Sequence, residues 1–166
     1  MSTAYYITVT IHVLAALLWL GGMFFLGLVG APVLRRIEPP ELRQQLFHSL
    51  GLRFRTVGWW AISVLVVSGV GVLHFRGLLQ WDAVLGNPAF WRTSMGIALA
   101  AKLVAVTVIL SLSAVHDFSM GPAAGRAPAG SAEAQRLRQR AAMLARVNGM
   151  LALGLVIAAV RLARGG

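Results

Sequence analysis

The chain has 166 residues, of which 58% are hydrophobic and only 12% are charged, about half the charged share of a typical soluble domain. It has no cysteine, which excludes disulfides, thiolate metal sites and iron–sulfur clusters. Fifteen lysine and arginine residues against five acidic residues give a formal net charge of +10, but the arginines stand between long apolar blocks, which indicates membrane topology and not nucleic-acid binding.

Four long apolar segments predict four transmembrane helices. Each comes close to the ~20 residues that a helix needs to cross the hydrocarbon core of a bilayer. No alternation typical of a β-barrel is present, and a helix is the other structure that satisfies its own backbone hydrogen bonds in lipid. We therefore expect an all-α fold, an integral membrane four-helix bundle that forms one domain over residues 1–166. The helices should cover approximately residues 6–34, 56–77, 94–118 and 140–163.

The first segment, “YYITVTIHVLAALLWLGGMFFLGLVGAPVL”, contains one histidine, His12. No lysine or arginine precedes this segment and it is too long for the core of a signal peptide, so we expect a retained helix. An imidazole at membrane depth is costly and tends to face the interior of a bundle, where it has a function. The alternative is that His12 only bonds a neighbouring helix.

An amphipathic link is expected between the first and second helices. Apolar side chains recur four residues apart in “PELRQQLFHSLGLRFR”: Leu42, Leu46, Leu50 and Phe54. This spacing predicts a helix that lies along the cytoplasmic face of the membrane and leads into the second span. Its His48 is expected to be a solvated residue of that interface.

The second and third helices carry further polar groups near the outer side of the membrane. His74 ends the second helix on the same side as His12, because the two helices run in opposite directions, and Arg76 follows it. Lys102 lies about two turns into the third helix. Met95, seven residues before it, projects from the same helical face. In a four-helix bundle these groups can share one outward-facing polar pocket.

The third helix ends in “SAVHDFSMGP”. Gly121 and Pro122 are expected to end it, and Asp117 is expected to pair with Arg146 or another arginine; the roles of His116 and Asp117 otherwise stay open. The next stretch, “MGPAAGRAPAGSAEA”, is rich in glycine, alanine and proline and predicts a flexible cytoplasmic loop. A helical pattern resumes in “AEAQRLRQRAAMLARV” and leads into the fourth helix.

The arginines predict the orientation of the bundle. The two long links hold ten of them: Arg35, Arg36, Arg43, Arg53 and Arg55 in the first, and Arg126, Arg136, Arg138, Arg140 and Arg146 in the second. The opposite side has four: Arg76, Arg92, Arg161 and Arg164. By the positive-inside rule, both termini lie outside and the two basic links lie in the cytoplasm.

Several kinds of chemistry fit two histidines at similar depth on neighbouring helices. In a copper site, His12, His74 and Met95 would be the ligands, since imidazole and thioether suit Cu(I). In a haem b site, His12 and His74 would be the axial ligands. Lys102 with Arg76 would then hold the propionates. A proton relay would use His12 and Lys102. A non-catalytic helper subunit, which packs against a larger membrane complex through glycine-rich helix faces, is the alternative from another class.

Three stretches together resemble short bacterial membrane proteins of the copper resistance protein D (CopD) family: “IHVLAALLWLGGMFFLGLVGAPVLRR”, “FRTVGWWAISVLVVSGV” and “KLVAVTVILSLSAVHDFSMGP”. The ordered combination of His-x6-Trp-x-Gly-Gly, Phe-Arg-x-x-Gly-Trp and Lys…His-Asp-Phe carries the resemblance. It covers most of the chain, helices one to three best and helix four least. The resemblance implies a four-helix inner-membrane protein associated with copper handling, matching only the core of the longer family members.

A fainter similarity is to the four-helix membrane protoporphyrinogen oxidase family, which is associated with b-type haem. His12, Trp19 with Gly22, and Lys102 match its outline of a histidine early in helix one, a Trp-Gly pattern and a lysine in helix three. The “HDFxxGP” ending of helix three favours the copper-type relatives instead.

These observations lead to one interpretation: a multi-pass protein of the bacterial inner membrane that binds and handles a redox metal centre near the periplasmic side. The cofactor is copper or haem b, and the sequence leaves open whether the protein is an enzyme. The expected partners are the lipid bilayer, a periplasmic copper or electron-transfer protein, and a larger membrane complex or a second copy of the chain. Nucleic acid is not an expected partner.

Overall fold

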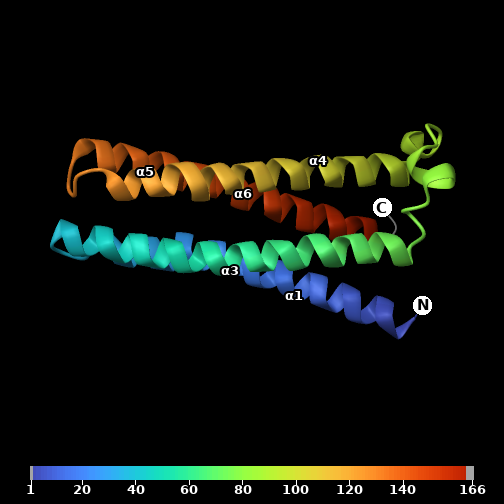
Figure 1. Ribbon diagram of the computed structural model, residues 1–166, viewed down its shortest axis with the longest axis horizontal. Helices are drawn as coiled ribbons and strands as arrows, with labels where there is room; N and C mark the ends of the chain where they lie inside the picture. Colours follow the sequence, from blue (N-terminus) through green and yellow to red (C-terminus); the bar gives the residue numbers. More distant parts are fainter. Residues whose placement is uncertain (1, 164–166) are drawn as a thin grey trace.

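A computed structural model describes residues 2–163 of the chain. Over this range the backbone is almost entirely helical and contains no β-strand. Figure 1 shows the long helices side by side in an elongated bundle, with the beginning of the first helix and the end of the last helix at the same end of the bundle. The predicted all-α four-helix bundle is therefore confirmed.

The four long helices consist of several segments. The first is built from α1 (Thr3–Phe25), η1 (Leu26–Gly30) and α2 (Ala31–Leu34), and the second is α3 (Pro40–Phe75). The loop that follows contains η2 (Trp81–Leu85) and η3 (Phe90–Arg92). The third long helix is α4 (Ser94–Val115), continued by η4 (His116–Met120) and α5 (Gly121–Arg126), and the fourth is α6 (Ala132–Ala163). Each of the four is long and apolar enough to cross a membrane.

Hydroxyl side chains mark the beginnings of three of these helices. Ser2, Thr93 and Ser131 each accept a hydrogen bond from the backbone N–H three residues later, at 3.1 to 3.3 Å. Such a cap satisfies one of the N–H groups that the first turn of a helix leaves without a partner. Local sequence therefore sets where α1, α4 and α6 begin.

Two π-helical turns allow the long helices to continue past prolines. Proline has no backbone N–H, and its ring clashes with the carbonyl four residues earlier, so it normally kinks or ends a helix. The wider turns η1 and η4 come directly before the segments that contain Pro32 and Pro122, and a π turn is the form in which a long helix absorbs such an interruption. The expectation that Gly121 and Pro122 end the third helix was wrong, since it continues to Arg126. Only residues 127–131 of the predicted flexible loop lie outside helices.

The amphipathic link is helical, as expected, but it runs in line with the second span and not along the membrane face. The 36 residues of α3 give a length of about 54 Å, against ~30 Å for the hydrocarbon core, so part of α3 projects beyond the core. The projecting part is held by the neighbouring hairpin: Gln44 Nε2 donates to the carbonyls of Gly125 at 3.0 Å and Ala127 at 2.9 Å. This packing holds the link in line with the second span, while Leu42, Leu46 and Leu50 stay exposed.

The bundle consists of two helix pairs. α1 packs along α3 and α4 packs along α6, and the pairs meet where α1 contacts α6 and α3 contacts α5. A buried cluster around Trp19 fills the centre and includes Ala61, Ile62, Ile109 and Ala152. Outside this cluster many large apolar side chains are exposed, Leu17 at 64% and Val67 at 72%. An apolar surface of this extent suits contact with acyl chains.

Candidate functional site

His12 is held by a hydrogen bond between the first two long helices. Its Nδ1 lies 2.9 Å from Oγ of Ser68 on α3. Ser68 is buried, and its own hydroxyl donates to the carbonyl of Val64 one turn earlier. Because the Ser68 proton is used by that carbonyl, the Ser68 oxygen accepts from His12. We therefore assign the ring proton to Nδ1, which leaves a lone pair on Nε2.

Small residues on α3 allow this part of α1 to pack closely against it. A Cβ on Gly69 would lie 3.4 Å from Cε1 and 3.8 Å from Nδ1 of His12, so the ring occupies the space next to that glycine. A Cβ on Gly71 would lie 3.0 Å from Cγ2 of Thr8. Small residues allow helix backbones to approach closely in lipid, and here they bring the imidazole against the buried serine.

His74 lies at a different level from His12. Its side chain is exposed at the end of α3, with its ring centre 5.8 Å from that of Phe75, and Phe75 packs at 6.3 Å on Tyr5 near the start of α1. His12 is paired with Ser68, six residues before His74, so the two imidazoles are about 9 Å apart along the helix axis. The expectation that the two rings share a level is corrected, and a haem with both as axial ligands requires such a shared level.

The other predicted site residues lie toward the same end. Lys102 is half-buried on α4, within electrostatic range of both His12 and Arg76. Met95, in the first turn of α4, is 54% exposed, and Arg76 is exposed directly after α3. His12 and Lys102 are thus partly buried, whereas His74, Met95 and Arg76 are exposed. In the described part of the chain, no three His, Asp or Glu side chains form a group that could hold a metal ion.

A second polar cluster lies on the π-helical turn η4. Oδ2 of Asp117 accepts a hydrogen bond from Trp59 Nε1 at 2.9 Å, and Oδ1 lies 2.8 Å from Nδ1 of His116. Arg55 donates to the backbone carbonyl of Asp117 at 3.3 Å. The expected pairing of Asp117 with Arg146 is corrected, because Trp59 and His116 take both carboxylate oxygens.

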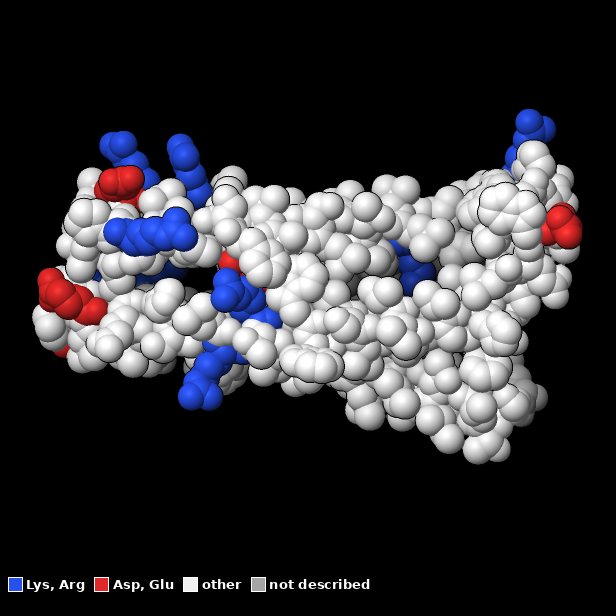
Figure 2. Space-filling view, viewed as in Figure 1, with Lys and Arg blue, Asp and Glu red and all other residues white. Residues whose placement is uncertain are grey.

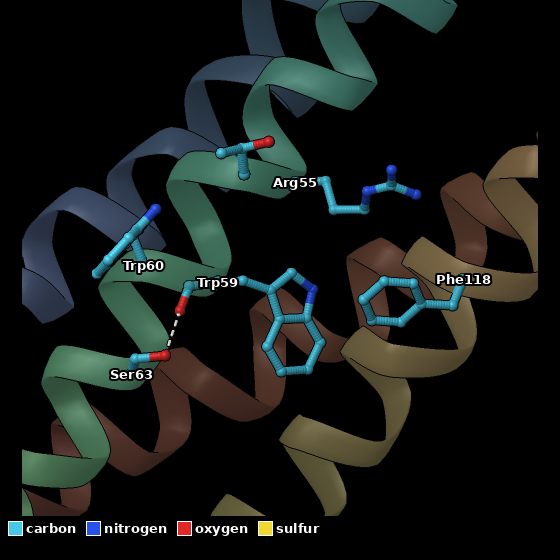
Figure 3. A pocket seen from close by; sticks show the side chains of 6 residues that line it. Arg55, Trp59, Trp60, Ser63 and Phe118 are labelled. Carbon is cyan, nitrogen blue, oxygen red and sulfur yellow. Dashed lines mark hydrogen bonds between the residues drawn. The ribbon is translucent and has the colours of Figure 1, made fainter.

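An open groove borders this cluster. Figure 3 shows Arg55 and Trp59 reaching from α3 toward Phe118 on the neighbouring helix, while Trp60 points away from them. The guanidinium carbon of Arg55 lies 5.5 Å from the centre of the Phe118 ring, and the Trp59 ring centre lies 5.4 Å from it. The groove has a volume of about 350 Å³, and its lining residues are Arg55, Thr56, Trp59, Trp60, Ser63 and Phe118.

The sequence alone did not indicate this groove. Its one signal in the sequence is the spacing of Arg55, Trp59 and Ser63, since residues four apart lie on one face of a helix. The contribution of Phe118 depends on the π turn, which determines where its ring points, and helix periodicity does not predict such a turn.

Comparison with known proteins gives two matches. The family model of copper resistance protein D matches residues 49–162. A protein of Aquifex aeolicus (strain VF5), described as an uncharacterized protein, is 32% identical over 111 residues, which are 67% of this chain and 66% of that protein. No solved structure matches the chain.

The motifs suggested a resemblance that is best in helices one to three and least in helix four, but the family model matches a different part of the chain. It includes most of α6 and leaves out α1, so His12 lies outside it, whereas His74, Met95, Lys102 and Asp117 lie inside it. The match nevertheless covers more than half of the chain, and four helices can span a membrane. The protein is thus a multi-pass protein of the bacterial inner membrane, and it belongs to the copper resistance protein D family.

Proposed function

We propose that this protein binds and handles Cu(I) in the periplasmic half of the inner membrane, with His12 as the ligand inside the bundle. The observation that carries the proposal is the 2.9 Å contact of His12 Nδ1 with Ser68 Oγ, together with the hydrogen bond of the Ser68 hydroxyl to the Val64 carbonyl, from which we assign the ring proton to Nδ1. A neutral imidazole with a free Nε2 lone pair is the form that binds a metal, and a hydrogen bond at the other ring nitrogen orients it. Membership of the family supports copper as the ion.

His74 and Met95 would be further Cu(I) ligands on a path that leads to His12 from the outer end of the bundle. His74 lies at the end of α3 and Met95 at the beginning of α4, and both side chains are exposed. Imidazole and thioether are ligands that Cu(I) accepts. Because His74 lies about 9 Å beyond the level of His12, the ion would pass from one ligand to the next and would not be held by all three at once.

The distribution of charge supports the orientation in this proposal. Figure 2 shows most lysine and arginine side chains gathered at one end of the molecule, which in Figure 1 carries the α2–α3 and α5–α6 turns. Basic residues favour the cytoplasmic side of a membrane protein. The end with His12, His74 and Met95 would then face the periplasm.

Cu(I) titration of the purified full-length protein in lipid nanodiscs tests the role of His12. Competition with a coloured Cu(I) chelator measures the affinity. We expect His12→Ala to abolish stoichiometric binding. Ser68→Ala should weaken it by about 10- to 100-fold, the usual effect of removing a group that orients a metal ligand. His48→Ala, an exposed histidine on the cytoplasmic part of α3, is the matched control and should bind as the wild type does.

Two results would contradict the proposal. Unchanged Cu(I) affinity in His12→Ala would reject this residue as the ligand. A reduced-minus-oxidised haem absorption band in the metal-free preparation, lost in His12→Ala, would favour a haem b protein instead. A wild-type protein that neither binds Cu(I) stoichiometrically nor shows a haem band would support the helper-subunit alternative.

A further inference from the structure

We propose that the groove beside Arg55 is a binding site for one anionic phospholipid of the cytoplasmic leaflet. The phosphate would lie on the guanidinium of Arg55, and an acyl chain would lie along Trp59 and Ser63. This site lies at the opposite end of the bundle from His12 and does not depend on the copper proposal.

The charge of the site favours an anionic headgroup. Arg55 is half-buried and forms no ion pair among residues 2–163. Its one hydrogen bond goes to a backbone carbonyl, that of Asp117. The carboxylate of Asp117 is engaged by Trp59 and His116, so the remaining guanidinium N–H groups of Arg55 are available to a phosphate. Arginine donors match the geometry of phosphate oxygens.

The shape and depth of the groove favour a lipid over a soluble anion. From Arg55 to Ser63 it follows one face of α3 for about 12 Å, and most of its lining is carbon. Trp59 and Trp60 lie one turn deeper than Arg55, and tryptophan gathers at the membrane interface. Arg55 is therefore at headgroup depth, and Ser63 is one turn further toward the acyl chains. Basic pockets between helices on the cytoplasmic side of membrane proteins bind anionic headgroups in this way.

Native mass spectrometry of the purified full-length protein tests the site. The protein is delipidated in mild detergent and mixed with phosphatidylglycerol or phosphatidylcholine that carry the same acyl chains. We expect one phosphatidylglycerol to be retained in preference to phosphatidylcholine. Arg55→Gln should reduce this retention by about fivefold, the contribution of one basic residue near an anionic membrane surface.

Three controls make the result specific. Arg53→Gln removes a neighbouring exposed arginine that does not line the groove, and it should retain the lipid as the wild type does. Ser63→Leu fills the deep end without changing the charge and should also reduce retention. His12→Ala changes the copper site alone and should leave retention unchanged. Thermal unfolding in the same detergent checks that each variant is folded.

The proposal would be overturned by any of three outcomes. These are equal retention of the two lipids by the wild type, an equal loss in Arg55→Gln and Arg53→Gln, and glycerol 3-phosphate binding as tightly as phosphatidylglycerol. The last result would mean that the site holds a soluble phosphate and that the apolar groove contributes nothing.

Discussion

Ser68 determines the chemistry of His12 through the direction of one hydrogen bond. Its hydroxyl donates within its own helix and therefore presents an acceptor to the neighbouring one. Serine and threonine in membrane helices commonly bond the carbonyl four residues earlier, so this direction comes from local backbone structure. The protonated ring nitrogen faces α3, and the other nitrogen is left for a ligand.

Gly69 provides the space for the imidazole, and substitutions of two sizes test this role. A methyl group would make ordinary contact with the His12 ring, so Gly69→Ala should retain Cu(I) affinity. Gly69→Leu needs the volume that the ring occupies and should lower the affinity to the level of His12→Ala, as measured by chelator competition. Equal affinity in the two variants would show that the ring position does not matter for binding.

Lys102 gives a prediction about charge at the same site. Its ammonium lies within electrostatic range of His12 and would repel a cation bound there, so Lys102→Met should raise the Cu(I) affinity severalfold in the same titration. Arg92→Met, an exposed cation in the α3–α4 loop, should have no such effect. A fall in affinity in Lys102→Met would contradict this electrostatic role, because it would mean that the lysine helps to hold the ion.

At the scale of elements, α4 and α6 meet through one buried polar pair. Asn148 Nδ2 donates to Ser113 Oγ at 2.8 Å, and both side chains are buried. Oδ1 of Asn148 is buried without a hydrogen-bond partner in the described part of the chain. Removing the serine therefore leaves the asparagine with no partner at all.

We expect Ser113→Ala to lower the free energy of unfolding in mixed micelles by about 0.6–2 kcal/mol, the range for hydrogen bonds between membrane helices. Ser111→Ala is the matched control, because Ser111 is exposed and bonds only the Thr107 carbonyl of its own helix. Similar losses in the two variants would mean that the interhelical bond does not contribute to stability.

The π turns show how far sequence patterns predict these elements. Helix length and apolar content predicted four spans, and the serine and threonine caps fit their observed beginnings. Pro122 was expected to end a helix, but η4 and the packing of α5 on α6 keep the chain helical to Arg126. The reason is tertiary: a helix continues past a proline when neighbouring helices hold it.

At the scale of the whole molecule, the two polar sites lie in opposite halves of the bundle. Lys102 and Asp117 are 15 residues apart on one helix, a separation of about 22 Å along its axis. Between them lies the buried cluster that includes Trp19 and Ile109. If His12 binds Cu(I) as proposed, the ion would therefore exchange with the end of the bundle that carries His74.

The absence of cysteine makes the orientation directly testable. Single cysteines at Asn87, in the α3–α4 loop, and at Ala129, in the α5–α6 turn, need no background removal. With a membrane-impermeant maleimide applied to cells whose outer membrane is permeabilised, we expect Asn87→Cys to be labelled and Ala129→Cys to be protected until the inner membrane is opened. The reverse pattern would place the His12 site on the cytoplasmic side.

The sequence by itself determined the all-helical membrane architecture, because long apolar segments have one stable form in lipid and arginines mark the links between them. It also indicated that His12 faces the interior of the bundle, with a function or with only a bond to a neighbouring helix as the two interpretations. Only the tertiary structure decided that the partner of His12 is Ser68, that His74 lies further out along the bundle than His12, and that the Asp117 carboxylate accepts a hydrogen bond from Trp59. The physical reason is that hydropathy fixes depth in the membrane, whereas the rotation and register of each helix follow from close contacts such as Gly69 on His12.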